Sequence, residues 1–153
     1  MTEKLNIGEI CQRTVAVVYQ HVDVSEAARL MSEHHVGSLV VVEGAADRQR
    51  VVGILTDRDI VIHIVARDRD AKAVRVADIM SRNPIAVRPE DSINDTLLLM
   101  RRHGIRRVPV TNVESMLIGI VSMDDLLETV ADQLHSLVQT IKSEQIREVR
   151  LRE

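Results

Sequence analysis

The stretch Gly53-Ile54-Leu55-Thr56-Asp57-Arg58-Asp59 joins a run of strand-forming residues to a helical pattern. Residues 51–55 are mostly valine, isoleucine and leucine, which predicts a buried strand, and the apolar residues of 60–65 predict one face of a helix. Thr56 stands where a helix N-cap is expected, and Asp59 follows three residues later, so both side chains gather around the free amide groups of the first turn. A strand that leads into a helix start is a ready site for an anion.

The same construction returns later as Gly119-Ile120-Val121-Ser122-Met123-Asp124-Asp125. The surrounding residues match too, since Met31 corresponds to Met100 at an offset of 69 residues. After residues 107–110 the offset falls to 66, because the second copy has a turn that is shorter by three residues. Each half has the order strand, helix, strand, strand, helix and would leave an apolar sheet face open. The duplication therefore predicts two halves that form one pseudo-symmetric body.

The predicted elements of the first half are a helical lead-in at 7–10, an extended segment at 14–19, a helix from Asp23 or Ser25 through Met31, strands at 38–42 and 51–55, and a helix from Thr56 to about Ala66. A connector of mixed charge, residues 67–72, predicts a solvated linker. We expect a first repeat at 7–70, a second repeat at 75–135 and a C-terminal helical tail at 136–153. The apolar stripe after Met123 weakens toward this tail, which either reaches a second subunit or projects into solvent.

Composition narrows the class of protein. With 153 residues and 45% hydrophobic residues, the chain has enough apolar material to form a core. Tyr19 is the only aromatic residue and the formal net charge is −3, which argues against nucleic-acid binding by base stacking or by general attraction to polyanions. Cys11 is the only cysteine, so an intramolecular disulfide is excluded. Without a signal-peptide or membrane-spanning pattern, we expect a soluble protein of the cytoplasm.

The residues that commonly carry catalysis form no recognisable constellation. The six histidines are scattered without cysteines or paired acids at zinc spacing, and Cys11 has no visible base partner. The sequence contains no phosphate-binding loop, dinucleotide fingerprint or nucleophile elbow. We therefore expect no enzymatic activity, no catalytic residues, no metal and no catalytic cofactor. Arg101, Arg102 and Arg106 are interpreted as a solvated helix end and loop rather than a nucleic-acid patch.

Both halves together resemble a tandem pair of CBS (cystathionine-beta-synthase) domains. The resemblance rests on the two matched motifs, the Asn83-Pro84-Ile85-Ala86-Val87 opening and the segment Gly104-Ile105-Arg106-Arg107-Val108-Pro109-Val110, and covers about 7–134. It implies an α/β fold class of the α+β-type CBS fold, with two pseudo-symmetric repeats packed through their sheets. It also implies two clefts that accept adenosine derivatives such as AMP, ATP, NAD or S-adenosylmethionine, in modules that commonly dimerise into a disc.

The resemblance also implies which residues form each cleft, because each cleft borrows the opening strand of the other repeat. The first cleft would use Thr56, Arg58, Asp59, Asn83, Ile85 and Ala86. The second would use Ser122, Asp125, Thr14, Val15 and Ala16. Val36 and Ile105 would flank the base, and Arg107 would reach a phosphate where its counterpart Ser38 supplies no charge, so unequal clefts are expected. The chemistry fits, since a carboxylate accepts ribose hydroxyls while a hydroxyl and helix amides meet a phosphate.

Two functional hypotheses follow from these observations. In the first, the chain is a free-standing regulatory module that binds an adenine nucleotide and signals to a protein effector by a change of shape or association, as a homodimer. In the second, the clefts are vestigial and the duplicated fold serves dimerisation or partner docking without a ligand. The paired Thr56 and Asp59, and likewise Ser122 and Asp125, also read as ordinary capping boxes, which need no ligand.

Overall fold

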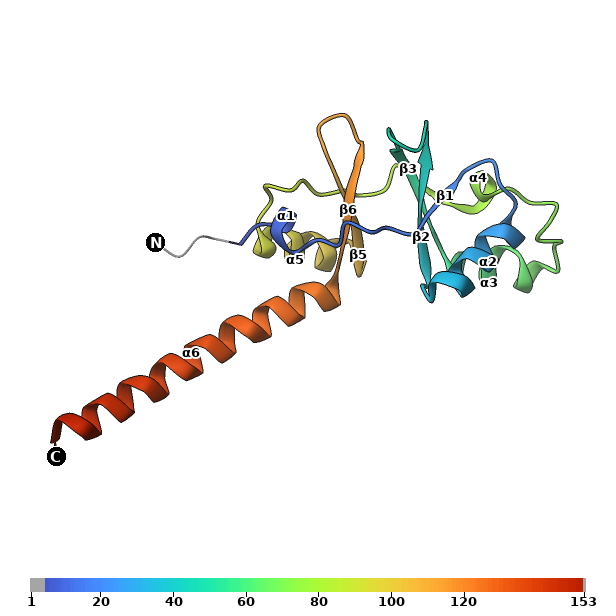
Figure 1. The fold of residues 1–153 in the computed structure, drawn as a ribbon. Helices are drawn as coiled ribbons and strands as arrows, with labels where there is room; N and C mark the ends of the chain where they lie inside the picture. Colours follow the sequence, from blue (N-terminus) through green and yellow to red (C-terminus); the bar gives the residue numbers. More distant parts are fainter. Residues whose placement is uncertain (1–4, 153) are drawn as a thin grey trace.

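The computed structural model describes residues 5–152 (Figure 1). The first half contains α1 (Ile7–Ile10), β1 (Val17–Tyr19), α2 (Val24–His34), β2 (Ser38–Glu43), β3 (Arg50–Thr56), α3 (Asp57–His63) and a 3-10 turn (Val65–Arg67). The second half contains α4 (Val76–Ile79), β4 (Ser81–Arg82), α5 (Ile93–His103), β5 (Arg107–Thr111), β6 (Leu117–Ser122) and α6 (Met123–Arg152). The expected α/β order of two matched repeats is confirmed.

Each half builds a sheet around an antiparallel hairpin, β2–β3 in the first half and β5–β6 in the second. In the first sheet β1 pairs parallel to β2, and β4 pairs antiparallel to β3. In the second sheet the two flanking strands are reduced to single β-bridges. Val87 pairs parallel with Val110 of β5, and Gln12 pairs antiparallel with Ile120 of β6. The two sheets therefore share one order, and the tips of their hairpins meet where the amide of Val51 donates to the carbonyl of Ser115 at 3.0 Å.

The short lead-in helices α1 and α4 are exchanged between the two halves. Ile7 of α1 is fully buried in the core of the second half with Met100 and Leu126. Val76 and Ile79 of α4 are buried in the core of the first half. Each core is therefore closed by a helix that the repeat pattern assigns to the other half.

Glycine occupies the first position of each matched motif for a steric reason. A β-carbon on Gly53 would lie 2.6 Å from the Sδ of Met80 and 2.9 Å from the carbonyl oxygen of Ser81. A β-carbon on Gly119 would lie 2.6 Å from the carbonyl oxygen of Gln12. At both places the opening segment of the other repeat crosses the strand, so the close approach of two backbones requires glycine.

Two helices end at different residues from those predicted. The helix α2 continues beyond Met31 to His34, and His35 caps it in the left-handed conformation, with φ 52° and ψ 44°. The helix α3 was predicted to reach about Ala66 but ends at His63; Ile64 is its C-cap, is buried in the core at 4% exposure, and is followed by the 3-10 turn. The helical pattern of the sequence continues through this break because the apolar spacing of a helix and of the following 3-10 turn is similar.

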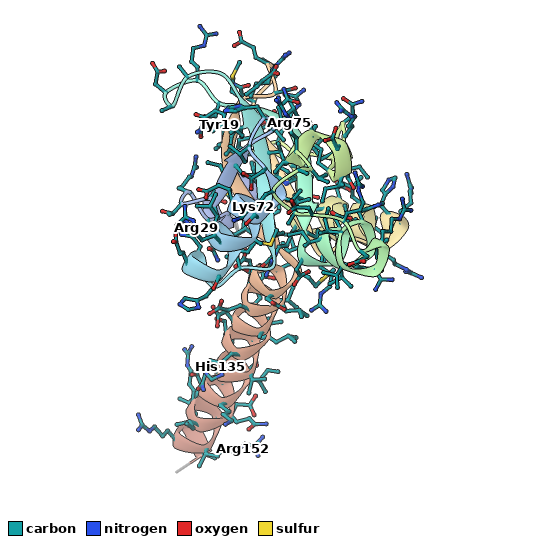
Figure 2. The ribbon with its side chains drawn as sticks, turned by 90° about the vertical axis from the view of Figure 1, so that its right-hand side faces the viewer. Tyr19, Arg29, Lys72, Arg75, His135 and Arg152 are labelled. Atoms are coloured by element: carbon teal, nitrogen blue, oxygen red, sulfur yellow. The ribbon has the colours of Figure 1, made fainter. Side chains whose placement is uncertain are left out.

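The last helix, α6, begins inside the body and then leaves it, as Figure 1 shows. Leu126 is fully buried against the second half. Every residue from 131 to 152 is exposed, and the side chains along this length, including His135 and Arg152 in Figure 2, point into solvent. Within residues 5–152, none of the helices has both the length and the apolar character that crossing a membrane requires.

Candidate functional site

The first matched motif forms a complete capping box at the start of α3. The Oγ1 of Thr56 accepts a hydrogen bond from the amide of Asp59 at 3.2 Å, and the Oδ2 of Asp59 accepts one from the amide of Thr56 at 2.9 Å. The amide of Asp57 donates to the carbonyl of Gly37 at 2.9 Å, which ties the corner to the segment before β2. The Oδ1 of Asp59 accepts no hydrogen bond from the described residues, so this oxygen is available to a ligand.

The second matched motif has the same cap with one additional contact. The Oγ of Ser122 accepts from the amide of Asp125 at 3.1 Å, and the Oδ2 of Asp125 accepts from the amide of Ser122 at 2.8 Å. The Oδ1 of Asp125 also accepts a hydrogen bond from the Nε2 of Gln12 at 3.0 Å. Both carboxylate oxygens of Asp125 are therefore occupied within the protein, whereas one oxygen of Asp59 is free.

A cavity of about 820 Å³ lies between the two halves and contains parts of both corners. Its volume is within the range of about 300–1,000 Å³ that is typical of small-molecule sites. The walls come from the ends of β3 and β6, the starts of β2 and β5, and the segment after β4. The lining residues are Gly37, Ser38, Leu39, Val40, Ile54, Thr56, Asp57, Arg58, Ser81, Arg82, Asn83, Pro84, Ile85, Gly104, Ile105, Arg106, Arg107, Ile120, Ser122, Met123 and Asp124.

The charged groups that line this cavity have a surplus of positive charge. They are Arg58, Arg82, Arg106 and Arg107 against Asp57 and Asp124. Guanidinium groups are always protonated and match the geometry of phosphate and carboxylate oxygens. The surplus of cations around a cavity with apolar walls suits a ligand that has both an apolar part and an anionic part.

The arginines of the cavity differ in how far they are already paired. The Nη1 of Arg107 donates to the Oγ of Ser38 at 3.1 Å, which joins the matching positions of the two repeats. Arg106 lies 3.7 Å from the carboxylate of Asp124, with both side chains more than three-quarters exposed. The side chain of Arg58 makes no ion pair or hydrogen bond with the described residues, so its guanidinium is free to meet an anion.

Eight of the residues predicted from the sequence line this cavity, namely Ser38, Thr56, Arg58, Asn83, Ile85, Ile105, Arg107 and Ser122. Seven do not line it, namely Thr14, Val15, Ala16, Val36, Asp59, Ala86 and Asp125. The residues 14–16 cross from β6 toward β2, where the carbonyl of Ala16 accepts from the amide of Val40 at 3.1 Å. The cavity therefore contains four of the six residues of the first predicted cleft, and of the second it contains only Ser122.

Four charged residues of the lining were not among the predicted site residues. Asp57 and Asp124 lie inside the two matched motifs, at the first and second positions after the capping residue, where the two motifs differ in sequence. Arg106 was interpreted as part of a solvated loop, and it is both exposed and at the cavity. Arg82 precedes the opening Asn83, whose left-handed backbone, with φ 46°, turns the chain at the cavity wall. No periodicity in the sequence marks such a turn.

Comparison with known proteins identifies the family. The profile of the CBS domain matches residues 7–66 and 76–132, which together are more than half of the chain. An uncharacterized protein of Methanopyrus kandleri is 36% identical over 124 residues, and these cover 81% of this chain and 62% of that protein. The chain therefore spans less than two thirds of that relative.

Solved structures agree in fold. An uncharacterized conserved protein from Pyrococcus horikoshii is 31% identical, with a TM-score of 0.72 over 85% of this chain and 95% of the other. The CBS domain pair of protein MJ0100, in complex with 5′-methylthioadenosine and S-adenosyl-L-methionine, has a TM-score of 0.74 over 86% of this chain and 99% of the other, at 21% identity. The chain belongs to the CBS domain family as a tandem pair, which confirms the resemblance seen in its sequence.

Proposed function

We propose that this CBS pair is a regulatory module that binds an adenosyl ligand with an anionic part, of the AMP, ATP, NAD or S-adenosylmethionine type, in the cavity between its halves. The observation that carries this proposal is one cavity with both apolar walls and a surplus of arginines. Ile85 and Ile105 provide aliphatic walls for the base, in a chain with almost no aromatic residues. The CBS pair of protein MJ0100, which shares the fold, holds two adenosyl compounds.

The first corner is the preferred position for the ribose and phosphate. Asp59 belongs to this corner although it does not line the cavity itself, and its free Oδ1 accepts from a ribose hydroxyl that extends from the cavity toward the start of α3. Both oxygens of Asp125 are engaged. Arg58, whose guanidinium is unpaired among the described residues, lines the same cavity as Thr56. Asn83 lines it from the opening segment of the second repeat. The two corners are therefore unequal in what they offer a ligand.

The signal is a change in the relation between the two halves. Arg107 contacts Ser38 across the halves, and an anion in the cavity competes for the same guanidinium. A ligand that favours one arrangement of the halves shifts the population toward it. We propose that the module acts in the cytoplasm as a homodimer and passes this change to a protein effector, without catalysing a reaction.

A second function, ligand-free docking or dimerisation with vestigial clefts, has one observation in its favour. Both corners are complete capping boxes, in which the four donors and acceptors satisfy one another without any ligand. Such boxes stabilise a helix start by themselves. The two functions differ in a single measurable property, which is affinity for an adenosyl compound.

A thermal-unfolding panel with AMP, ATP, NAD and S-adenosylmethionine separates the two functions, because a ligand of the folded state raises the unfolding midpoint by mass action. Calorimetry with the compound that raises this midpoint then tests whether Asp59 binds the ribose. The Asp59→Asn variant keeps an oxygen for the cap and loses the free carboxylate oxygen, so we expect about 10-fold weaker binding or more, the usual loss for a hydrogen bond to a charged group.

The matched control is Asp78→Asn, which alters the equivalent capping acid of α4, outside both matched motifs, and should leave affinity unchanged. Asp125→Asn should weaken binding less than Asp59→Asn, because its carboxylate is already occupied. Equal affinity of the Asp59, Asp125 and parent proteins would refute the ribose assignment. No shift with any of the four compounds would favour the docking function.

A further inference from the structure

The exposed length of α6 is the largest feature of the molecule that the cavity does not explain. From residue 131 to residue 152 every position is exposed. Eight of the fourteen large apolar side chains that are exposed in the described part of the chain lie on this helix: Leu127, Leu134, Leu137, Val138, Ile141, Ile146, Val149 and Leu151. An isolated helix is marginal in water, and clustered apolar side chains on a surface mark an interaction site.

These side chains form a stripe rather than a random scatter. Leu127, Leu134 and Ile141 follow one another at intervals of seven, and Leu137 and Val138 fill the spaces between them. Leu126, next to the start of the stripe, is fully buried against the body, whereas Leu127 is 57% exposed. The helix therefore turns one face toward its own body and an adjacent face toward solvent, and the stripe continues the second face.

Charge along α6 is divided between its two halves. Residues 123–137 carry four carboxylates and no lysine or arginine, whereas residues 138–152 carry four lysines or arginines and two carboxylates. The first half therefore has a net charge of −4 and the second of +2. A second α6 in the same direction would bring like charges together, and one in the opposite direction would bring unlike charges together. The charge pattern is complementary to itself only in the antiparallel sense.

We propose that α6 is the homodimer interface of this chain, formed by antiparallel pairing with α6 of a second copy. With the helix midpoints aligned, Leu134 meets Ile141 of the other copy, Leu137 meets Val138, and Glu128 meets Arg147. The helix of 30 residues provides an overlap of about 45 Å at 1.5 Å per residue. This inference rests on the self-association proposed above and gives it a surface.

The same features exclude the other usual partner of an amphipathic helix, an anionic lipid surface. Lipid-binding helices have a polar face rich in lysine and arginine. The polar residues of α6 comprise six carboxylates against four lysines and arginines, so the helix has a net charge of −2. A partner helix with one acidic end and one basic end fits this pattern, and α6 of a second copy is such a helix.

The mass of the full chain in solution, from light scattering after size exclusion, tests the interface. We expect a dimer, and we expect Leu134→Lys and Leu137→Lys to raise the dimer dissociation constant by about 100-fold or more, since each removes two apolar contacts from the pair. Both side chains are free of the body, so both variants should keep the parent unfolding midpoint of the body. The matched control is Val113→Lys, at a side chain that is 79% exposed outside α6, which should remain dimeric.

Oxidative cross-linking tests the direction of pairing in a Cys11→Ser background. In the antiparallel pair the double variant Leu134→Cys/Ile141→Cys forms a covalent dimer, because residue 134 of one copy lies opposite residue 141 of the other. The single variant Leu134→Cys does not, because the two copies of residue 134 are separated by about seven residues, or about 10 Å, along the helix, which is beyond the reach of a disulfide. Covalent dimers from Leu134→Cys alone and from Ile141→Cys alone would show parallel pairing and refute the proposal.

A dimer that survives both lysine variants would place the interface on the body, which refutes the role of α6 but keeps self-association. The mass of a monomer for the parent protein would refute both the α6 interface and self-association.

Discussion

Gly53 and Gly119 show how a single residue holds the two repeats together. Each lies where the opening segment of the other repeat crosses a central strand, and a β-carbon there would come within 2.6 Å of a neighbouring atom. We expect Gly53→Ala and Gly119→Ala each to lower the free energy of unfolding by about 1–3 kcal/mol, the usual cost of overpacking. Urea unfolding measures this loss. Val113→Ala, at an exposed side chain, should stay within about 0.5 kcal/mol of the parent. A Gly53→Ala protein with the parent midpoint would show that the two segments separate easily.

Single residues also show the limit of reading the site from sequence. The capping boxes of Thr56 and Ser122 could be predicted, because their partners are local and lie three residues away. The free oxygen of Asp59 and the occupied one of Asp125 could not, since the difference depends on Gln12, which is 113 residues from Asp125 in the chain. The inequality of the two corners was expected from Arg107 and Ser38, and the structure adds that these two side chains contact each other.

The helix ends provide a prediction at the scale of single elements. The helices α2 and α5 are matched copies, and both end in a left-handed residue, His35 in the first and Gly104 in the second. A side chain with a β-carbon is strained in this conformation and glycine is not. We therefore expect His35→Gly to raise, and Gly104→His to lower, the free energy of unfolding by about 1 kcal/mol each. Opposite shifts of the thermal midpoint would confirm this, and shifts of the same sign would contradict it.

Element order could be predicted almost entirely from the repeat, because matched apolar patterns imply matched strands and helices. Helix ends were less certain, as α3 shows: burial of Ile64 in the core overrides a helical pattern that continues to Ala66. Exchange of α1 and α4 was not predicted. These helices have four residues each, and nothing in a short apolar pair such as Ile7 and Ile10 specifies which core receives it.

At the scale of the whole molecule, this exchange means that the structural unit differs from the sequence repeat. The core around Val24 and Leu39 is completed by Val76 and Ile79 of α4, whereas Ile7 of α1 packs in the core of the second half. The fourth strand of the first sheet, β4, also follows the connector. A folding unit of the first half therefore extends from β1 through β4 and omits α1.

Two fragments of equal length test this unit, residues 13–82 and residues 1–70. The first contains all four strands of its sheet together with α4, and the second replaces α4 and β4 with α1, whose core is missing. We expect fragment 13–82 to show the circular dichroism of folded strands and helices and a cooperative thermal transition, although a domain of this size is marginal. Fragment 1–70 should lack the transition, because Val24, Leu39 and Leu55 would be exposed on the open core. A cooperative transition in fragment 1–70 would mean that the sequence repeat folds by itself and that the exchanged helices only join two finished domains.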